Sequence, residues 1–168
     1  MDYRGGMTQA PTLRLATIAD LAAVDDLLAR SYPRLLAKDY PPSVMVLAVP
    51  LFTRARPELL ASGRYHLAMS ETGQAVGAGG WSGRDQGLAQ VRHVATDPGH
   101  LRRGIGRAVM GRVLAEVATA GFAVLDCLST RTAVPFYASL GFEVLGRVDI
   151  ALGPGIAFPA VRMVRRMK

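Results

Sequence analysis

The strongest constraint on the fold comes from four consecutive segments in the second half of the chain. Ala89 to Ala95 has the composition of a strand and is closed by the turn-forming sequence Thr96-Asp97-Pro98-Gly99. From Arg103 to Ala120 apolar residues recur at helical spacing, and Gly121 is suited to end that helix. Phe122 to Leu128 is an almost continuous apolar run, typical of a strand covered on both faces. A right-handed β-α-β crossover would therefore make the two strands parallel neighbours.

The rest of the chain predicts strands and helices around this crossover. Residues 13–16 indicate a short strand, and a helix follows from Leu21 that Pro33 should stop or bend near Ser31. The segment from Pro41 to Ser62 indicates one or two helices around its prolines. Further strands are predicted at residues 65–70, 75–82, 142–147 and 157–166, and a short helix at residues 133–140.

These elements predict an α/β (α+β) fold with a mixed sheet of about seven strands flanked by helices. The parallel pair is the fourth strand with the fifth. The second and third strands form a hairpin, and Gly77, Gly79 and Gly80 in the third predict a bulge or a close approach by another part of the molecule.

The length of 168 residues fits one domain. We expect residues 1–10 to be a disordered extension and residues 11–168 to be that domain. The apolar stretch from Val44 to Phe52 is too short to cross a bilayer, and the N-terminus has no apolar secretory signal. Cys127 is the only cysteine, which excludes an internal disulfide and fits a reducing compartment. We therefore expect a cytoplasmic protein without membrane partners.

The formal net charge of +7 comes from an excess of arginine. A positive net charge suits the binding of nucleic acid and of an anionic cofactor equally well. We expect no nucleic-acid partner, since the sequence has no helix-turn-helix, RNA-binding aromatic or zinc-finger signature. With one cysteine and three scattered histidines, we also expect no metal site.

A glycine pair marks the start of the long helix. Gly104 and Gly106 follow a strand and a turn, where a helix N-terminus offers unpaired N–H groups to an anion. Three arginines add positive charge there, namely Arg102, Arg103 and Arg107. The third glycine of a dinucleotide-binding fingerprint would fall at Val109, and a Walker-type Gly-Lys-Ser/Thr is absent. The site therefore predicts anion binding outside both of those motifs.

Two stretches resemble a known family. Arg92 to Pro98, followed by Leu101 to Ala108, resembles motif A of the GNAT superfamily of N-acetyltransferases. Ala133-Val-Pro-Phe-Tyr-Ala-Ser-Leu-Gly-Phe142 is similar to motif B of that superfamily, A-x-x-F-Y-x-x-x-G-F. The two motifs in this order are more specific than either alone. The order of elements also resembles the GNAT fold, in which the parallel fourth and fifth strands splay apart.

The resemblance implies acetyl-CoA as co-substrate. The fourth strand would pair with the pantetheine, and the amides of Arg102 to Arg107 would hold the pyrophosphate. The residues implied in cofactor binding are Val94, Ala95, Thr96, Arg102, Arg103, Gly104, Ile105, Gly106, Arg107 and Phe136. Tyr137 would face the CoA sulfur and protonate the departing thiolate.

The sequence departs from the family pattern at two positions. Leu101 stands where the family often has Gln or Arg, and this costs little if backbone N–H groups bind the phosphates. Gln90 stands where several members carry a catalytic Glu, and an amide cannot serve as a base.

The general base is therefore unresolved. His93 is the first candidate, although on a regular strand it would face away from Gln90 and Val94. His66, Asp126 and Glu71 are weaker candidates, and a water-relayed proton path without a single base is the default. The following further roles are considered: a backbone N–H of Val94 or Ala95 for the oxyanion, Cys127 as an unfavoured nucleophile, and Trp81 as either pocket wall or core.

These observations predict an N-acetyltransferase that passes an acetyl group from acetyl-CoA to a primary amine by direct attack in a ternary complex. The alternative is a non-catalytic sensor that binds acyl-CoA. The acceptor, a small molecule or a peptide, is not defined by the sequence, and a homodimer is possible.

Overall fold

A computed structural model describes residues 11–168; the predicted disordered extension at residues 1–10 lies outside the described residues. The strands are β1 (Thr12–Leu15), β2 (Tyr65–Met69), β3 (Ala75–Gly83), β4 (Leu88–Thr96), β5 (Val124–Ser129), β6 (Glu143–Gly153) and β7 (Ile156–Arg166). The helices are α1 (Leu21–Leu36), α2 (Pro42–Phe52), α3 (Pro57–Leu60), α4 (Ile105–Thr119) and α5 (Val134–Ser139), with short 3-10 turns η1 (Ile18–Asp20) and η2 (Pro98–His100).

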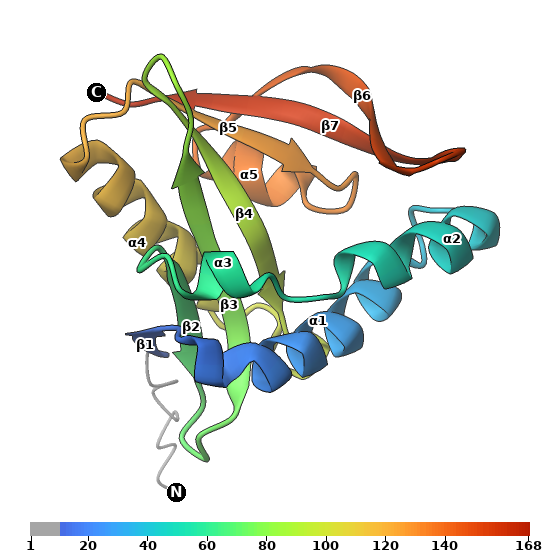
Figure 1. The fold of residues 1–168 in the computed structure, drawn as a ribbon, viewed down its shortest axis with the longest axis horizontal. Coiled ribbons are helices and arrows are strands. Elements are labelled where there is room, and N and C mark those ends of the chain that lie inside the picture. The colour runs from blue at the N-terminus through green and yellow to red at the C-terminus, as the bar shows by residue number, and fades with distance from the viewer. Residues whose placement is uncertain (1–10) are drawn as a thin grey trace, which may run out of the picture.

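The seven strands form one mixed sheet in the order β1-β2-β3-β4-β5-β7-β6. All neighbours are antiparallel except β4 and β5, which are parallel. Helices cover both faces: α1 and α3 lie in front of the sheet in Figure 1, and α4 and α5 lie behind it. The predicted mixed sheet and its parallel pair are confirmed.

The parallel strands β4 and β5 separate along their length. Their residues pair only from Leu88 to Gln90 on β4 and from Val124 to Asp126 on β5. Both strands then continue, to Thr96 and Ser129. The sheet is therefore open between their C-terminal halves, as the resemblance implied.

A bulge in β4 accompanies this opening. Gly80 pairs with Arg92 and Ala78 with Ala95, so β4 carries one residue more than β3 between these pairs. His93 lies in the bulge with a φ of 47°, which is uncommon for a residue with a side chain. The bulge predicted from the glycines of the third strand is thus present, with the extra residue on β4.

The glycines of β3 also permit a close approach by α4. A Cβ at Gly79 would lie 2.7 Å from Cγ1 of Val109, and one at Gly77 would overlap Ile105. Larger side chains there would hold the helix away from the sheet. The glycine spacing therefore positions the start of α4, where the anion site was predicted.

Helix α1 differs from the prediction. It does not stop near Ser31 but continues through Pro33 to Leu36. Pro33 cannot donate a backbone hydrogen bond, yet Leu27 and Leu36 are buried on either side of it. This burial favours the continuous helix over the local preference of proline.

The sheet has a separate apolar core on each face. The core under α4 includes Trp81, Val91, Met110, Val113, Leu125, Cys127 and Tyr137. The core under α1 and α3 includes Val24, Leu27, Leu28, Leu60, Tyr65 and Leu67. Within residues 11–168 no helix has both the length and the apolar character needed to cross a membrane.

Candidate active site

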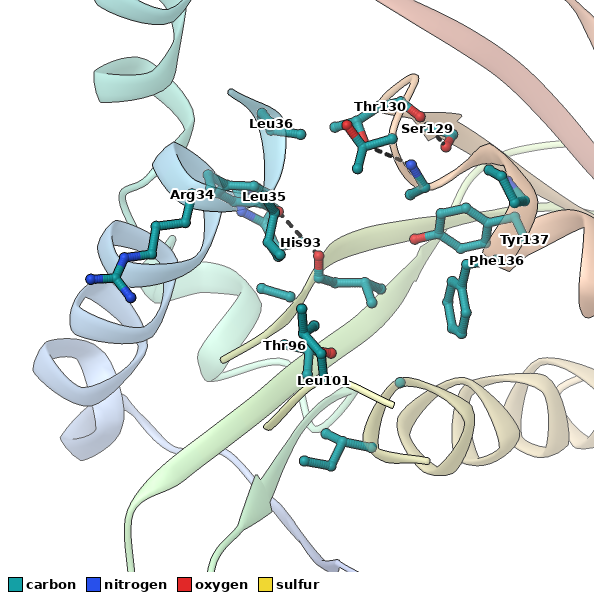
Figure 2. Close-up of a pocket in the computed structure, with 18 of the residues that line it drawn as sticks. Arg34, Leu35, Leu36, His93, Thr96, Leu101, Ser129, Thr130, Phe136 and Tyr137 are labelled. Atoms are coloured by element: carbon teal, nitrogen blue, oxygen red, sulfur yellow. Dashed lines mark hydrogen bonds between the residues drawn. The ribbon is translucent and has the colours of Figure 1, made fainter. Parts of the chain in front are cut away.

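The opening between β4 and β5 holds a cavity of about 1050 Å³. Its lining comes from the C-terminal part of α1, the bulged half of β4, the turn before α4, the end of β5 and α5 (Figure 2). A volume of this size lies at the upper end of the range for small-molecule sites. The cavity therefore provides space for a large ligand.

One end of the cavity is the turn that precedes α4. Arg102 and Gly104 both have left-handed backbone conformations, with φ of 61° and 76°. Such alternation in a turn directs successive N–H groups to one side and forms a concave anion site. The helix begins at Ile105 with Gly104 as its N-cap, so the predicted start at Arg103 is wrong by two residues. The left-handed glycine explains the difference, since it cannot continue a right-handed helix.

Side chains brace this turn against α5. Arg107 donates a hydrogen bond of 3.1 Å to the hydroxyl of Ser139. A Cβ at Gly106 would lie 3.1 Å from the ring of Phe136, so glycine leaves room for that ring at the cavity wall. The two predicted motifs therefore meet in space, at the N-terminus of α4 and on α5.

Most of the sequence-predicted site residues line this one cavity. They are His93, Val94, Ala95, Thr96, Arg102, Gly104, Ile105, Gly106, Arg107, Phe136 and Tyr137. Arg103 does not line it but belongs to the same turn. The structure brings these residues together, and their individual roles stay predictions.

The hydroxyl groups of two tyrosines, one buried and one half-buried, hold the β4 bulge. The hydroxyl of Tyr65 donates to the carbonyl of His93 at 2.7 Å, and that of Tyr32 donates to the carbonyl of Val94 at 3.2 Å. Because a trans peptide is planar, a fixed carbonyl also fixes the following N–H in the opposite direction. The N–H groups of Val94 and Ala95 therefore point away from the tyrosines that hold their peptides.

These tyrosines could not be found by sequence reasoning. They lie 28 and 62 residues from their partners in the chain, and neither belongs to a motif. The only available signal was a polar aromatic residue within an apolar stretch, which more often indicates core packing.

His93 does not follow the strand alternation expected from the sequence. The bulge interrupts that alternation, and His93 and Val94 line the same cavity. Burial, followed by the nearby charges of Arg92 and Arg56, lowers the pKa of His93 to about 4. The imidazole is therefore neutral at pH 7 and a weak proton acceptor.

Tyr137 lies at the other end of the cavity from the turn. Its ring is buried between Phe136 and Phe142, at centroid distances of 5.2 and 5.4 Å, and Figure 2 shows its hydroxyl directed into the cavity. Burial, followed by the neighbouring Cys127, raises the pKa of Tyr137 well above its usual value. The phenol therefore stays protonated at neutral pH and can donate a hydrogen bond into the cavity.

Cys127 is a buried thiol in the wall of the same cavity, 2% exposed. Burial raises its pKa to about 12, against a smaller opposing effect of the Tyr137 hydroxyl. At neutral pH almost no thiolate is present, which disfavours a nucleophilic role.

The histidine of β2 lies elsewhere. His66 is bonded through Nε2 to the carboxylate of Glu116 on α4, at 3.0 Å from Oε2. The indole of Trp81 donates to the same oxygen at 3.4 Å and packs against Phe122. Neither His66 nor Trp81 lines the cavity, and Trp81 is a core residue.

The two acidic candidates for the base also lie outside the cavity lining. Asp126 forms an ion pair with Arg162, in which Nε of the arginine lies 2.9 Å from Oδ1 of the carboxylate. Glu71 is exposed in the turn between β2 and β3. In the part of the chain that the structure describes, no three His, Cys, Asp or Glu side chains gather as a metal site requires.

Comparison with known proteins places this geometry in a family. The family described as acetyltransferase (GNAT) domain matches residues 49–158. No curated protein sequence matches the chain.

Solved structures show the same fold at low sequence identity. A GCN5-related N-acetyltransferase from Rhodopseudomonas palustris is similar at 20% identity and a TM-score of 0.77, over 94% of this chain and 96% of that one. The PaiA N-acetyltransferase of Thermoplasma acidophilum, in complex with coenzyme A, is similar at 15% identity and a TM-score of 0.72, over 94% of this chain and 99% of that one. A phosphinothricin acetyltransferase of Sinorhizobium meliloti, in complex with acetyl-CoA, is similar at 22% identity and a TM-score of 0.65, over 95% of this chain and 89% of that one.

The match to the family covers more than half of the chain, and it includes the bulged strand, the turn before α4 and the tyrosine of α5. The chain belongs to the GNAT acetyltransferase family.

Proposed function

We propose that the protein is an N-acetyltransferase that transfers the acetyl group of acetyl-CoA to a primary amine by direct attack in a ternary complex. One observation carries this proposal: a single cavity joins an anion-binding turn to a buried, protonated phenol. The bulged half of β4 lies between these two ends and turns its amides away from Tyr65 and Tyr32.

The cavity suits acetyl-CoA in charge and in size. The turn from Arg102 to Gly104 and the N-terminus of α4 would hold the pyrophosphate through backbone N–H groups, with Arg107 adding charge. Strand β4 would bind the pantetheine, since its partner β5 has separated there. Similar structures from Thermoplasma acidophilum and Sinorhizobium meliloti contain CoA and acetyl-CoA, which supports this choice.

Two groups of the chain and water in the cavity would serve the transfer. The N–H of Val94 or Ala95 would stabilise the oxyanion, and the hydroxyl of Tyr137 would protonate the departing thiolate. Only about one in a few thousand lysine-like amines is neutral at pH 7, so a proton must first leave the amine. We assign this step to water in the cavity. His93 is the alternative proton acceptor, but its low pKa makes the imidazole a weak base.

A screen of amines tests the proposal. Purified protein with acetyl-CoA should release CoA in the presence of at least one amine class, and mass spectrometry should find the N-acetylated product. Release of CoA without an acetylated amine would indicate thioester hydrolysis. Tight binding of acetyl-CoA without turnover on a broad panel would favour the alternative, a non-catalytic acyl-CoA sensor.

A further inference from the structure

We infer that β6 pairs with β6 of a second copy of this chain. The two strands would run antiparallel about a two-fold axis at Val148, with Arg147 of each copy opposite Asp149 of the other. Three features of β6 support this pairing: an open edge, outward-directed backbone groups and the order of two charges. No residue of β6 lines the cavity, so the pairing does not depend on the proposed reaction.

Strand β6 forms one edge of the sheet, and among the described residues it pairs with β7 alone. Figure 1 shows it at the rim of the molecule. With 11 residues it is long for a strand in this position. Register shifts near its two ends leave a regular segment at residues 146–151. A regular open edge presents unpaired N–H and C=O groups to which another strand can bind.

The hydrogen bonds around β7 show to which side its backbone groups point. In an antiparallel pair, successive residues direct these groups to alternate sides. Met167 donates its N–H to the carbonyl of Ala123, next to β5. The carbonyl of Pro159 accepts from the hydroxyl of Tyr40, which itself accepts the N–H of Arg131, just beyond β5. The odd-numbered residues of β7 therefore direct their backbone groups to the side of β5, away from β6.

Two residues of β6 consequently direct their backbone groups to the open edge. Arg147 lies opposite Val161, and Asp149 lies opposite Pro159. Because both β7 residues point away from β6, these are the non-hydrogen-bonded pairs of the hairpin. The N–H and C=O groups of Arg147 and Asp149 therefore face outward, whereas those of Val148 face β7.

The charges of β6 select one register for pairing of the strand with itself. Arg147 and Asp149 are exposed, and two residues apart on a strand they share a face. Within residues 11–168 neither forms an ion pair. An axis at Val148 sets each arginine opposite an aspartate and lets each such pair exchange both backbone hydrogen bonds. An axis at Asp149 would set two aspartates opposite each other, and an axis at Arg147 two arginines.

Exposed apolar side chains lie beside the regular segment. Val144 and Leu145 are each 56% exposed. In the Val148 register they approach Ala151 and Leu152 at the other end of the second copy's strand. Pairing would therefore remove apolar surface from water at both ends of the contact, in addition to joining the backbones.

A cysteine at the axis provides a direct test. Val148 would lie opposite itself in a non-hydrogen-bonded pair, where the Cα atoms are about 4.5 Å apart, within reach of a disulfide. Val148→Cys should therefore form a covalent dimer with oxidised glutathione, seen on a non-reducing gel. Ala151→Cys is the matched control, because its two copies would be about 20 Å apart and should stay unlinked. The natural Cys127 is 2% exposed in both variants.

Charge reversal tests the same register without a cross-link. Sedimentation velocity over a dilution series should find the parent as a dimer of the 17.9 kDa chain. Arg147→Asp and Asp149→Arg should each raise the dimer Kd at least tenfold, because two attractive cross-strand pairs become repulsive. The double variant restores opposite charges and should return the Kd to within about threefold of the parent. Arg112→Asp makes the same charge change on the exposed side of α4 and should leave the Kd unchanged.

The outcomes decide between this surface and others. A parent that is monomeric throughout the series would overturn the pairing. A dimer that tolerates each single reversal would place the contact elsewhere on the molecule. Linkage of Ala151→Cys in place of Val148→Cys, or no recovery in a folded double variant, would overturn the register. Circular dichroism shows that each variant is folded.

Discussion

Two parts of the cavity wall are built in different ways. The turn before α4, which we propose to hold the cofactor, is a short turn and a helix N-terminus, in which Arg102 and Gly104 supply the conformation and the backbone would supply the donors. The β4 bulge, which we propose to face the acceptor, is held by tyrosines from β2 and α1. A backbone site tolerates changes of side chain, whereas a site made of distant side chains can be adapted to one acceptor. The following predictions test that division.

The largest effect on chemistry should come from Tyr137→Phe. The change removes one hydroxyl and keeps the ring that packs against Phe136 and Phe142. If the phenol protonates the thiolate, kcat should fall at least tenfold, while the Kd of acetyl-CoA stays within about threefold. Steady-state kinetics with an acceptor from the screen, together with calorimetry, measures both. An unchanged kcat with chemistry shown to be rate-limiting would remove Tyr137 from its proposed role.

A smaller loss should follow Tyr65→Phe, because this residue acts through the peptide after His93. The variant loses the 2.7 Å hydrogen bond to the His93 carbonyl, and the Val94 N–H is then held less firmly in the orientation that we propose for binding the oxyanion. We expect a fall in kcat of about fivefold with little change in KM.

Tyr40→Phe is the matched control for that change. Tyr40 is also buried; its hydroxyl donates to the carbonyl of Pro159 at 2.7 Å and accepts the backbone N–H of Arg131 at 2.8 Å, and neither partner belongs to β4. Tyr65→Phe should lose about 1 kcal/mol of stability and Tyr40→Phe about 2 kcal/mol, because it gives up two hydrogen bonds, but only Tyr65→Phe should lower kcat. Equal effects on kcat would show that Tyr65 has a structural role alone.

His93 should make the protein less stable in mild acid. Its pKa is about 4 in the fold against an ordinary value of 6.5, so the unfolded chain binds the proton first as the pH falls. The stability that the neutral imidazole contributes above pH 6.5 is therefore lost progressively toward pH 4. Urea unfolding at pH 7 and pH 5 should show His93→Asn losing about 1 kcal/mol less than the parent, after allowance for solvent screening. Equal losses would place the imidazole in a more solvated environment.

The smallest effect on activity should come from Cys127→Ala. The thiol is buried and protonated, so direct transfer needs nothing from it. A small cavity should cost about 1 kcal/mol of stability, and kcat should stay within about twofold. An inactive variant, together with an acyl-enzyme trapped in the parent and detected by mass spectrometry, would replace direct transfer by a covalent route.

The difference between local and long-range contacts also decides how much of the fold and the site could be predicted from the sequence. The crossover and the seven strands were predicted because apolar periodicity and turn residues are local signals. That Gly104, Gly106 and Tyr137 lie at one cavity could be predicted because they belong to contiguous motifs. The orientation of the His93 side chain was not predicted, because the bulge that contains His93 depends on the pairing of β4 with β3.

The remaining differences have similar causes. Helix α1 passes through Pro33 because residues on both sides are buried in the cores, which the local sequence does not show. Tyr32 and Tyr65 reach the β4 bulge only through the tertiary fold. Long-range contacts therefore shape the β4 bulge, and local sequence shapes the turn before α4.

The central claim is that the turn before α4 binds the pyrophosphate of acyl-CoA, and calorimetry with two variants of one residue tests it most directly. Gly104 has a φ of 76° with open space around its Cβ position. Asn tolerates this conformation without charge, whereas Asp adds a negative charge at nearly the same size. Gly104→Asp should bind acetyl-CoA at least tenfold more weakly than the parent, which corresponds to about 1.4 kcal/mol, and Gly104→Asn should stay within about threefold. Equal affinity of the parent and a folded Gly104→Asp protein would contradict the claim.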